Sequence, residues 1–136
     1  MIRTTLMIAT VAVVLAACGA GEPPRPDHEI VAERAQARWD ALLAGDYAAA
    51  LEFHTPAFRE RTPVEAYRAD MSNRPVRWVS AEARETSCEE DRCSVEMLVG
   101  YRLSSGPAQL SGMGNQRPIN ETWVRIDDNW WYVPGD

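Results

Sequence analysis

Lysine is absent from this 136-residue chain: all 14 basic residues are arginine, and 20 acidic residues bring the formal net charge to -6. Proteins that bind nucleic acids neutralise phosphates with a basic surface and usually have a basic balance. The acidic balance therefore argues against a nucleic-acid partner. The bias toward arginine and alanine is typical of codon composition, and no function is inferred from it.

The sequence also lacks the motifs of several enzyme classes. It contains no Gly-x-Ser-x-Gly elbow, no phosphate-binding loop and no His-Glu-x-x-His zinc motif. Gly112-Met113-Gly114 lacks the spacing and context of a dinucleotide fingerprint. We therefore expect no cofactor, and the chain offers few ligands for a metal.

The N-terminus has the pattern of a secretory signal peptide. One early positive charge, Arg3, precedes an apolar run over residues 6–17. The run is shorter than the roughly 20 residues that a spanning helix needs. Its end, Leu15-Ala16-Ala17-Cys18, resembles the lipobox of bacterial lipoproteins. The alternative is an ordinary signal peptide with an incidental cysteine.

The lipobox resemblance implies that residues 1–17 are removed and that Cys18 receives a diacylglyceryl thioether and further acyl chains such as palmitate. Two or three such chains anchor a protein stably to a membrane. Gly19 follows in place of an acidic residue, which in such lipoproteins favours the periplasmic face of the outer membrane. Residues 18–27, with three prolines, then form a flexible tether, and residues 28–136 form the domain.

Two cysteines, Cys88 and Cys93, flank a four-residue stretch that suits a hairpin loop. In an oxidising compartment such a pair usually forms a disulfide. A zinc site, the main alternative, would need two further ligands, and the chain has only two histidines, His28 and His54. Free or redox-active thiols are the other alternative.

Apolar spacing predicts helices in the first half of the domain. Val31, Ala35, Trp39 and Leu42 form one stripe of a helix over residues 27–44, with Asp27 as its cap and the charged side chains, Arg38 among them, off the stripe. Gly45 stops this helix and Asp46 caps a second, shorter one. A helical turn follows the Thr-Pro pair at 55–56, and a Thr-Pro-Val-Glu capping box at 62–65 opens a last helix that ends near residue 72.

After Pro75 the period changes to that of strands. Residues 76–87 and 93–103 flank the cysteine hairpin, and the second run alternates apolar and polar side chains. Residues 104–118 are rich in Gly, Pro and Ser and read as a long connection. A last hairpin turns at residues 127–129, with four aromatic side chains that supply apolar surface. The prediction is an α+β domain: about three helices on one face of a curved antiparallel sheet.

This order of elements resembles the NTF2-like superfamily, whose cone-shaped domains include nuclear transport factor 2, ketosteroid isomerase and SnoaL-type cyclases. The stretch RWDALLAGDYAAALEFHTPAFRE (38–60) looks like the start of such domains, and NETWVRIDDNWWYVPGD (120–136) looks like their close. Cystatin-like domains, with one long helix on a sheet, are the nearest competitor. Three helical segments before the first strand argue against them.

The resemblance implies a conical pocket between the helices and the sheet. The side chains expected to bind a ligand there are Trp39, Tyr47, Tyr67, Met97 and Tyr101. Catalytic members of the superfamily place Asp, His or Tyr groups in an apolar cavity, which shifts their pKa values. Here no spacing forces such a set together, and His54 reads as a helix end.

We therefore expect a non-enzymatic envelope lipoprotein that binds a small apolar ligand or an envelope protein partner. The alternative is a small metal-free isomerase or dehydratase that works in the cone. A buried Asp or His beside a Tyr in a roomy pocket would favour the enzyme, and a cavity filled by Trp and Met would oppose it. A homodimer through the open sheet face is a further expectation, since it is common among proteins of this kind.

Overall fold

Four helices precede a four-stranded sheet in the computed structural model, which describes residues 21–104, 106–110 and 112–135. The elements are α1 (Asp27–Leu43), α2 (Tyr47–Leu51), α3 (Pro56–Arg61), α4 (Val64–Ser72), β1 (Val76–Glu89), β2 (Arg92–Leu103), β3 (Gly114–Ile126) and β4 (Asn129–Val133). All neighbouring strands are antiparallel, in the order β1-β2-β3-β4. The α+β class and the helical first half are as predicted.

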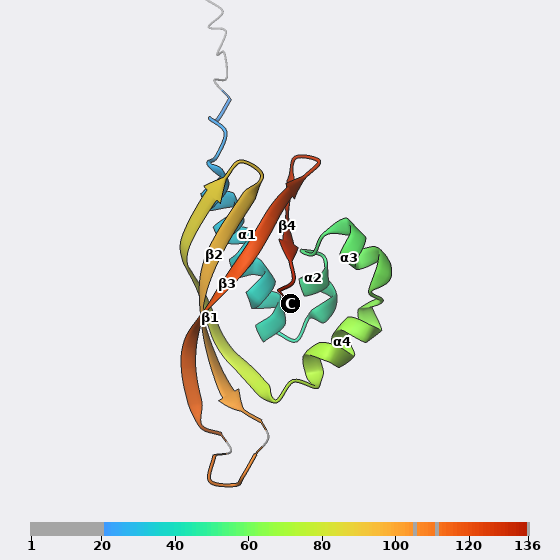
Figure 1. Ribbon diagram of the computed structural model, residues 1–136, viewed down its shortest axis with the longest axis vertical. Helices are drawn as coiled ribbons and strands as arrows, with labels where there is room; N and C mark the ends of the chain where they lie inside the picture. Colours follow the sequence, from blue (N-terminus) through green and yellow to red (C-terminus); the bar gives the residue numbers. More distant parts are fainter. Residues whose placement is uncertain (1–20, 105, 111, 136) are drawn as a thin grey trace, which may run out of the picture.

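Helix α1 lies along one face of the sheet, with α3 and α4 to the side of β4 (Figure 1). The predicted stripe of α1 is buried throughout, and it packs against the inward side chains of β2 and β3. The core residues shared by these three elements are Val31, Ala35, Trp39, Leu42, Val95, Met97, Val99 and Trp123. The second layer is therefore built mainly by one helix.

Two irregularities bend strand β1 around this core. Its register against β2 shifts between Trp78 and Ser80 and again between Ala83 and Thr86. Such bulges bend a strand and increase its twist. At the first one, a Cβ on Gly100 would lie 2.3 Å from Oγ of Ser80, so the glycine leaves room for that hydroxyl.

The segment between α2 and α3 docks on the edge of β4. The Tyr132 N–H donates to the carbonyl of Phe53 at 2.7 Å, and the Thr55 N–H donates to the carbonyl of Tyr132 at 3.3 Å. His54 thereby forms a parallel bridge with Tyr132. This contact brings a histidine from the helical layer next to the last strand.

The end of α1 and the N-cap of α2 were predicted correctly. Gly45 has a φ of +72°, and the Asp46 carboxylate accepts a hydrogen bond from the Ala49 N–H at 3.0 Å. Two other predicted caps were wrong. Pro26 and Pro63 occupy the N-cap positions of α1 and α4, neither with a side-chain cap.

Asp27 has a different role from the predicted cap. Its carboxylate accepts hydrogen bonds from Trp130 Nε1 at 3.1 Å and from Arg125 Nη2 at 2.7 Å. It therefore ties the start of α1 to the last two strands, a long-range use of its oxygens that a local capping pattern does not reveal.

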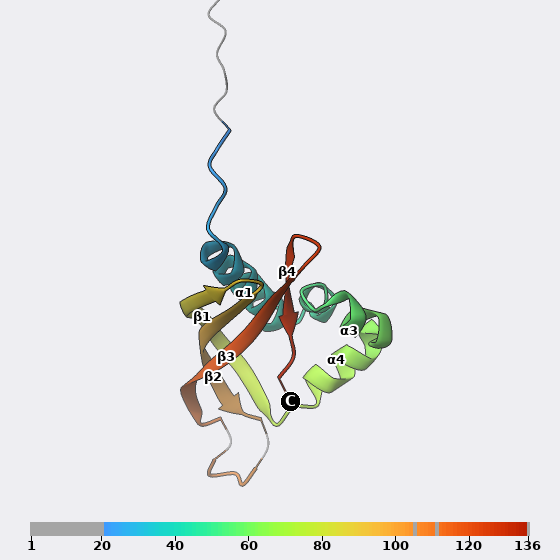
Figure 2. The same ribbon diagram turned by 45° about the horizontal axis from the view of Figure 1, so that its top comes forward.

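The connection after β2 is shorter than predicted, because β3 already begins at Gly114. Residues 115–117 pair with residues 99–101 of β2 despite their weak strand propensity. Pro118 is tolerated there because β4 pairs only with residues 122–126 of β3, which leaves the earlier part of β3 as an edge. This connection lies at the end of the domain opposite residues 21–26 (Figures 1 and 2).

Candidate functional site: an aromatic cavity with a buried ion pair

A cavity of about 540 Å³ lies between the helices and the sheet. Its walls come from α1, α3, α4, β1, β3 and β4 and from the residues that follow β4. Clefts of roughly 300–1,000 Å³ are typical of small-molecule sites. The aromatic side chains of its lining are Trp39, Phe58, Tyr67, Trp78 and Tyr132.

The inner wall holds a buried ion pair between Arg38 of α1 and Glu121 of β3. Their side chains are 5% and 2% exposed, and Arg38 Nη2 donates to Oε1 of Glu121. The same carboxylate accepts from Trp39 Nε1 at 2.6 Å and from Trp123 Nε1 at 3.2 Å. Three donors therefore share this carboxylate, as a buried charge requires.

Sequence reasoning missed this pair. Arg38 was placed off the apolar stripe, although it lies seven residues after Val31 and three after Ala35, which puts it on the same side of the helix. Ile119, Glu121 and Trp123 occupy every second position, so their side chains lie on the same face of the strand. This spacing was the signal in the sequence that Glu121 is buried. When an acidic residue of a strand and a basic residue of a helix both occupy positions that face the core, they are compatible with an internal ion pair.

His54 is 2% exposed and lies on the cavity wall beside aromatic rings. Its ring stacks on Phe58 at 4.6 Å between centroids and meets the edges of Tyr67 at 5.1 Å and Tyr132 at 4.9 Å. Burial, together with the charge of Arg38, lowers the pKa of His54 to about 4. The imidazole is therefore neutral at neutral pH.

The hydrogen bond of His54 determines which ring nitrogen carries the proton. Nδ1 lies 3.2 Å from the carbonyl oxygen of Leu51, an acceptor, so the proton is on Nδ1. This tautomer leaves a lone pair on Nε2. His54 does follow the end of α2 and binds its last carbonyl, as a helix-end residue would, but it does so as a neutral ring and not as the cation that such a position favours.

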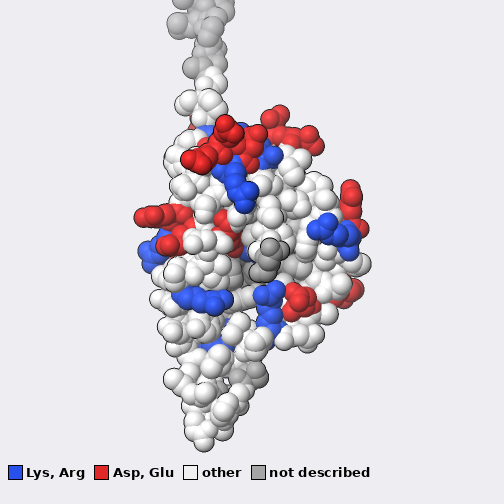
Figure 3. All heavy atoms as spheres, viewed as in Figure 1, with Lys and Arg blue, Asp and Glu red and all other residues white. Residues whose placement is uncertain are grey.

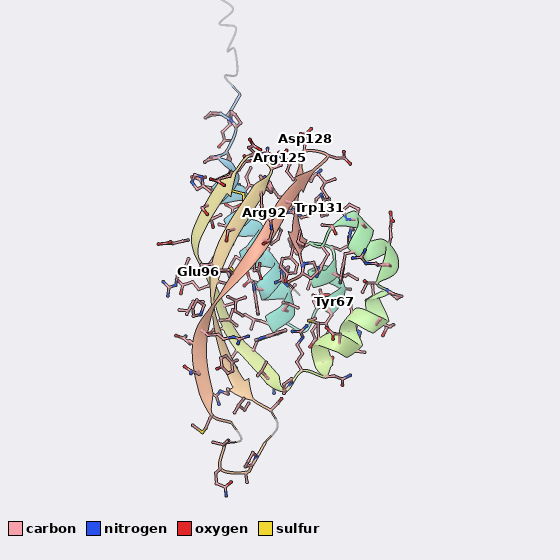
Figure 4. The ribbon with its side chains drawn as sticks, in the orientation of Figure 1. Tyr67, Arg92, Glu96, Arg125, Asp128 and Trp131 are labelled. Atoms are coloured by element: carbon pink, nitrogen blue, oxygen red, sulfur yellow. A yellow bond between two sulfur atoms is a disulfide. The ribbon has the colours of Figure 1, made fainter. Side chains whose placement is uncertain are left out.

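The two tyrosines of the cavity are also perturbed. Burial raises the pKa of Tyr67 and that of Tyr132, while the nearby Arg38 charge acts in the opposite direction. The Arg38 guanidinium lies 3.8 Å from the ring centroid of Tyr132, a cation–π distance. Tyr67 lies between α4 and the sheet (Figure 4). Both phenols are protonated donors at neutral pH.

The rim of the cavity is more charged than its interior. Asp70 and Arg74 form an ion pair at 3.0 Å, and Arg117 lies on β3, on the same face as Glu121. All three rim side chains belong to exposed residues. In the view of Figure 3, arginine atoms lie at mid-height of the molecule, both over the sheet and over the helices. Acidic atoms lie beside the arginine atoms over the helices.

The structure brings together two of the five predicted ligand-binding residues. Trp39 and Tyr67 line the cavity. Tyr47 lines a neighbouring hollow at the end of α1, and Met97 is fully buried in the core without lining the cavity. Tyr101 is half-buried on β2 outside the cavity lining, 5.9 Å from the Arg117 guanidinium.

The cysteine hairpin contains a disulfide. Cys88 and Cys93 face each other across the β1–β2 pair with their Cα atoms 4.0 Å apart, and their sulfur atoms are bonded. Among the described residues, no group of three or more His, Cys, Asp or Glu side chains is placed to hold a metal ion.

The predicted lipidation site, Cys18, lies outside the described residues. Residues 21–26 are exposed, have no regular secondary structure and lead away from the domain (Figure 1). None of the helices in the described ranges is long and apolar enough to cross a membrane.

The chain matches no protein-family model and no curated protein. Its fold is similar to that of two SEC-C motif containing proteins. One is from Rhodopseudomonas palustris, with 17% identity, 76% of this chain and 74% of that chain covered, and a TM-score of 0.57. The other is from Psychrobacter arcticus, with 13% identity, 84% of this chain and 63% of that chain covered, and a TM-score of 0.57.

The fold is also similar to that of a candidate dehydratase of the NTF2-like family from Streptomyces avermitilis. The identity is 18%, 78% of this chain and 90% of that chain are covered, and the TM-score is 0.54. At such low sequence identities, the similarity shows the fold alone. The domain is an α+β domain with an NTF2-like fold.

Proposed function

We propose that this protein is a membrane-anchored lipoprotein of the bacterial envelope that binds a small ligand in its cone. The observation that carries the binding role is the cavity of about 540 Å³. It combines aromatic walls with a few convergent polar groups, as small-molecule sites do. Met97 packs in the core outside this space, whereas the core residues Trp39, Leu42 and Tyr67 form part of its wall.

Retention of a natural ligand tests the binding role. We expect the protein purified from a bacterial envelope to carry an adduct in native mass spectrometry that is released on denaturation. The mass of this adduct would narrow the ligand class. A bare protein, recovered under conditions that keep known complexes intact, would contradict ligand binding and favour a protein partner on the outer surface.

The anchoring role is supported by the sequence around Cys18, by its lipobox pattern and by the proline-rich stretch that follows. An extended tether leaving one end of the domain would hold the cone near a membrane surface without inserting it. In this proposal the anchor lies in the periplasmic face of the outer membrane, and the acyl chains provide the membrane affinity.

Replacement of the predicted lipid attachment site tests the anchor. Cys18→Ser should move the protein from the detergent phase to the aqueous phase in phase partitioning. The double variant Cys88→Ser/Cys93→Ser is the matched control, because it also replaces cysteines with serine but should stay in the detergent phase. If Cys18→Ser still partitions as the wild type does, the lipoprotein assignment is wrong.

One observation favours a second candidate function, a metal-free dehydratase or isomerase. His54 is buried in a roomy cavity beside Tyr67 and Tyr132, and its Nε2 lone pair could accept a proton. A neutral imidazole and protonated phenols are suitable groups for general acid–base chemistry. One neighbour in fold is a candidate dehydratase.

Untargeted mass spectrometry of small molecules distinguishes a dehydratase or isomerase activity from ligand binding without turnover. The protein would be incubated with a small-molecule extract, and His54→Asn would serve as the comparison. Loss of water or isomerisation of a compound with the wild type, absent with the variant, would establish catalysis. Identical profiles together with a retained adduct would support binding without turnover.

A further inference from the structure

Among the residues that the structure describes, the charged side chains that line the cavity leave positive charge uncompensated. Three arginines, Arg38, Arg74 and Arg117, face two acidic residues, Asp70 and Glu121. The Glu121 carboxylate is already shared among three donors, and Asp70 is paired with Arg74. Neither acid is therefore available to a cationic ligand.

Of the three arginines that line the cavity, Arg117 is the one that forms no ion pair with an acidic side chain in the described ranges. It lies on the same face of β3 as Ile119 and Glu121, all three of which line the cavity. Its guanidinium is 5.9 Å from the centroid of the Tyr101 ring, a cation–π distance. The mouth of the cavity therefore has a guanidinium that can still take a negative group.

A second donor lies deeper. The Nε–H of Arg38 is buried and has no acceptor among the described residues, although the side chain is only 5% exposed and lines the cavity. An unmade hydrogen bond of a buried charged donor costs free energy. A ligand oxygen in the cavity would supply the missing acceptor.

The walls between these two donors are flat and aromatic. Trp39 and Trp78 meet edge to face at 5.2 Å, and Phe58, Tyr67 and Tyr132 surround His54 on the other side. Aromatic rings pack well against planar, polarisable groups. The neutral His54 adds no charge that would favour or repel an ion.

We infer that the cavity takes a small aromatic carboxylate, with its ring among these aromatic side chains and its negative group at Arg117. This inference rests on the proposed binding function and names the chemical class of the ligand. A planar acid fits the excess of guanidinium groups, because a carboxylate accepts two N–H bonds from one guanidinium. A second oxygen on the ring would accept from Arg38 Nε.

The test compares three probes of one shape and different charge: 2-naphthoate, 2-naphthamide and 2-naphthylmethylammonium. Binding to the purified full-length chain would be followed by quenching of tryptophan fluorescence, since two indoles line the cavity. Each titration would be corrected with a protein-free blank. We expect 2-naphthoate to bind about tenfold or more tightly than the amide, the size of one charge-assisted hydrogen bond.

Two arginine variants locate the preference. Arg117→Gln should remove most of the advantage of 2-naphthoate over the amide, while the amide itself binds as before. Arg92→Gln is the matched control, because Arg92 is an exposed arginine at the β1–β2 turn outside the cavity and its replacement should change nothing.

The outcomes separate this inference from the proposed function. If the amide or the ammonium probe binds as tightly as 2-naphthoate, the acid specificity is wrong while cavity binding stands. If Arg92→Gln lowers the preference as much as Arg117→Gln, the site assignment is overturned. If no probe binds although the protein retains its natural adduct, the aromatic class is wrong and the binding function stands. If no probe binds and no adduct is found, both fail.

Discussion

Arg38 and Glu121 are charged side chains that are almost fully buried. Taking two charges out of water costs several kcal/mol each, which the domain offsets by pairing them and adding two indole donors. The pair links α1 to β3 across the inner wall of the cavity. It therefore fixes the position of Trp39 and of the guanidinium that faces Tyr132.

Removing one partner should cost more than removing both. Glu121→Leu leaves the Arg38 charge unpaired, and we expect a loss of about 3–5 kcal/mol in the free energy of unfolding. Arg38→Met/Glu121→Leu should lose less than the sum of the two single variants, as measured by urea denaturation. Additive losses would show that the two side chains do not act as a pair.

His54 makes the stability of the domain depend on pH. Its pKa is about 4 in the folded protein and about 6.5 when unfolded, so below pH 6.5 the unfolded state binds a proton that the folded state does not. Stability is therefore full above pH 6.5 and falls toward pH 4, by about 3 kcal/mol for this group. Urea denaturation of the wild type and of His54→Gln between pH 7 and pH 4.5 measures it. Parallel curves for the two proteins would contradict the assignment.

The helices and strands differ in how far local sequence determines them. The boundaries of α1 and α4 follow from apolar spacing, glycine and proline, all of which are local signals. The start of β3 does not, because residues such as Asn115 and Gln116 gain strand geometry only from pairing with β2. The cap of α1 was mispredicted for a related reason, since the Asp27 oxygens accept hydrogen bonds from Trp130 and Arg125 at long range.

The β1–β2 hairpin offers a test at the level of one element. Cys88→Ala/Cys93→Ala should lower the free energy of unfolding by about 2 kcal/mol, because the closed ring is small. Fully reduced wild type should behave like this variant in the same denaturation experiment. Labelling of two thiols in the folded, unreduced wild type would instead show that the cysteines are free.

Residues 21–26 and the β2–β3 connection lie at opposite ends of the molecule (Figures 1 and 2), and the cavity lies between the helices and the sheet. The α+β class and the order of elements could be predicted from sequence because they rest on periodicity, and the NTF2-like fold was implied by a resemblance in the order of elements. Which side chains form the wall of the cavity could not be predicted from sequence. His54 enters it through a bridge to β4, and Arg38 enters it through a partner 83 residues away. Both depend on tertiary contacts that no local spacing encodes.

The central claim is that the cavity is a binding site, and blocking its mouth tests it most directly. Ala66 lines the cavity from α4, whereas Ala69 is exposed on the same helix outside the lining. Native mass spectrometry of envelope-purified protein would compare Ala66→Trp with Ala69→Trp. The account predicts that Ala66→Trp loses the bound adduct while Ala69→Trp retains it at the wild-type level. Equal occupancy in both variants would place the ligand outside the cavity and contradict the claim.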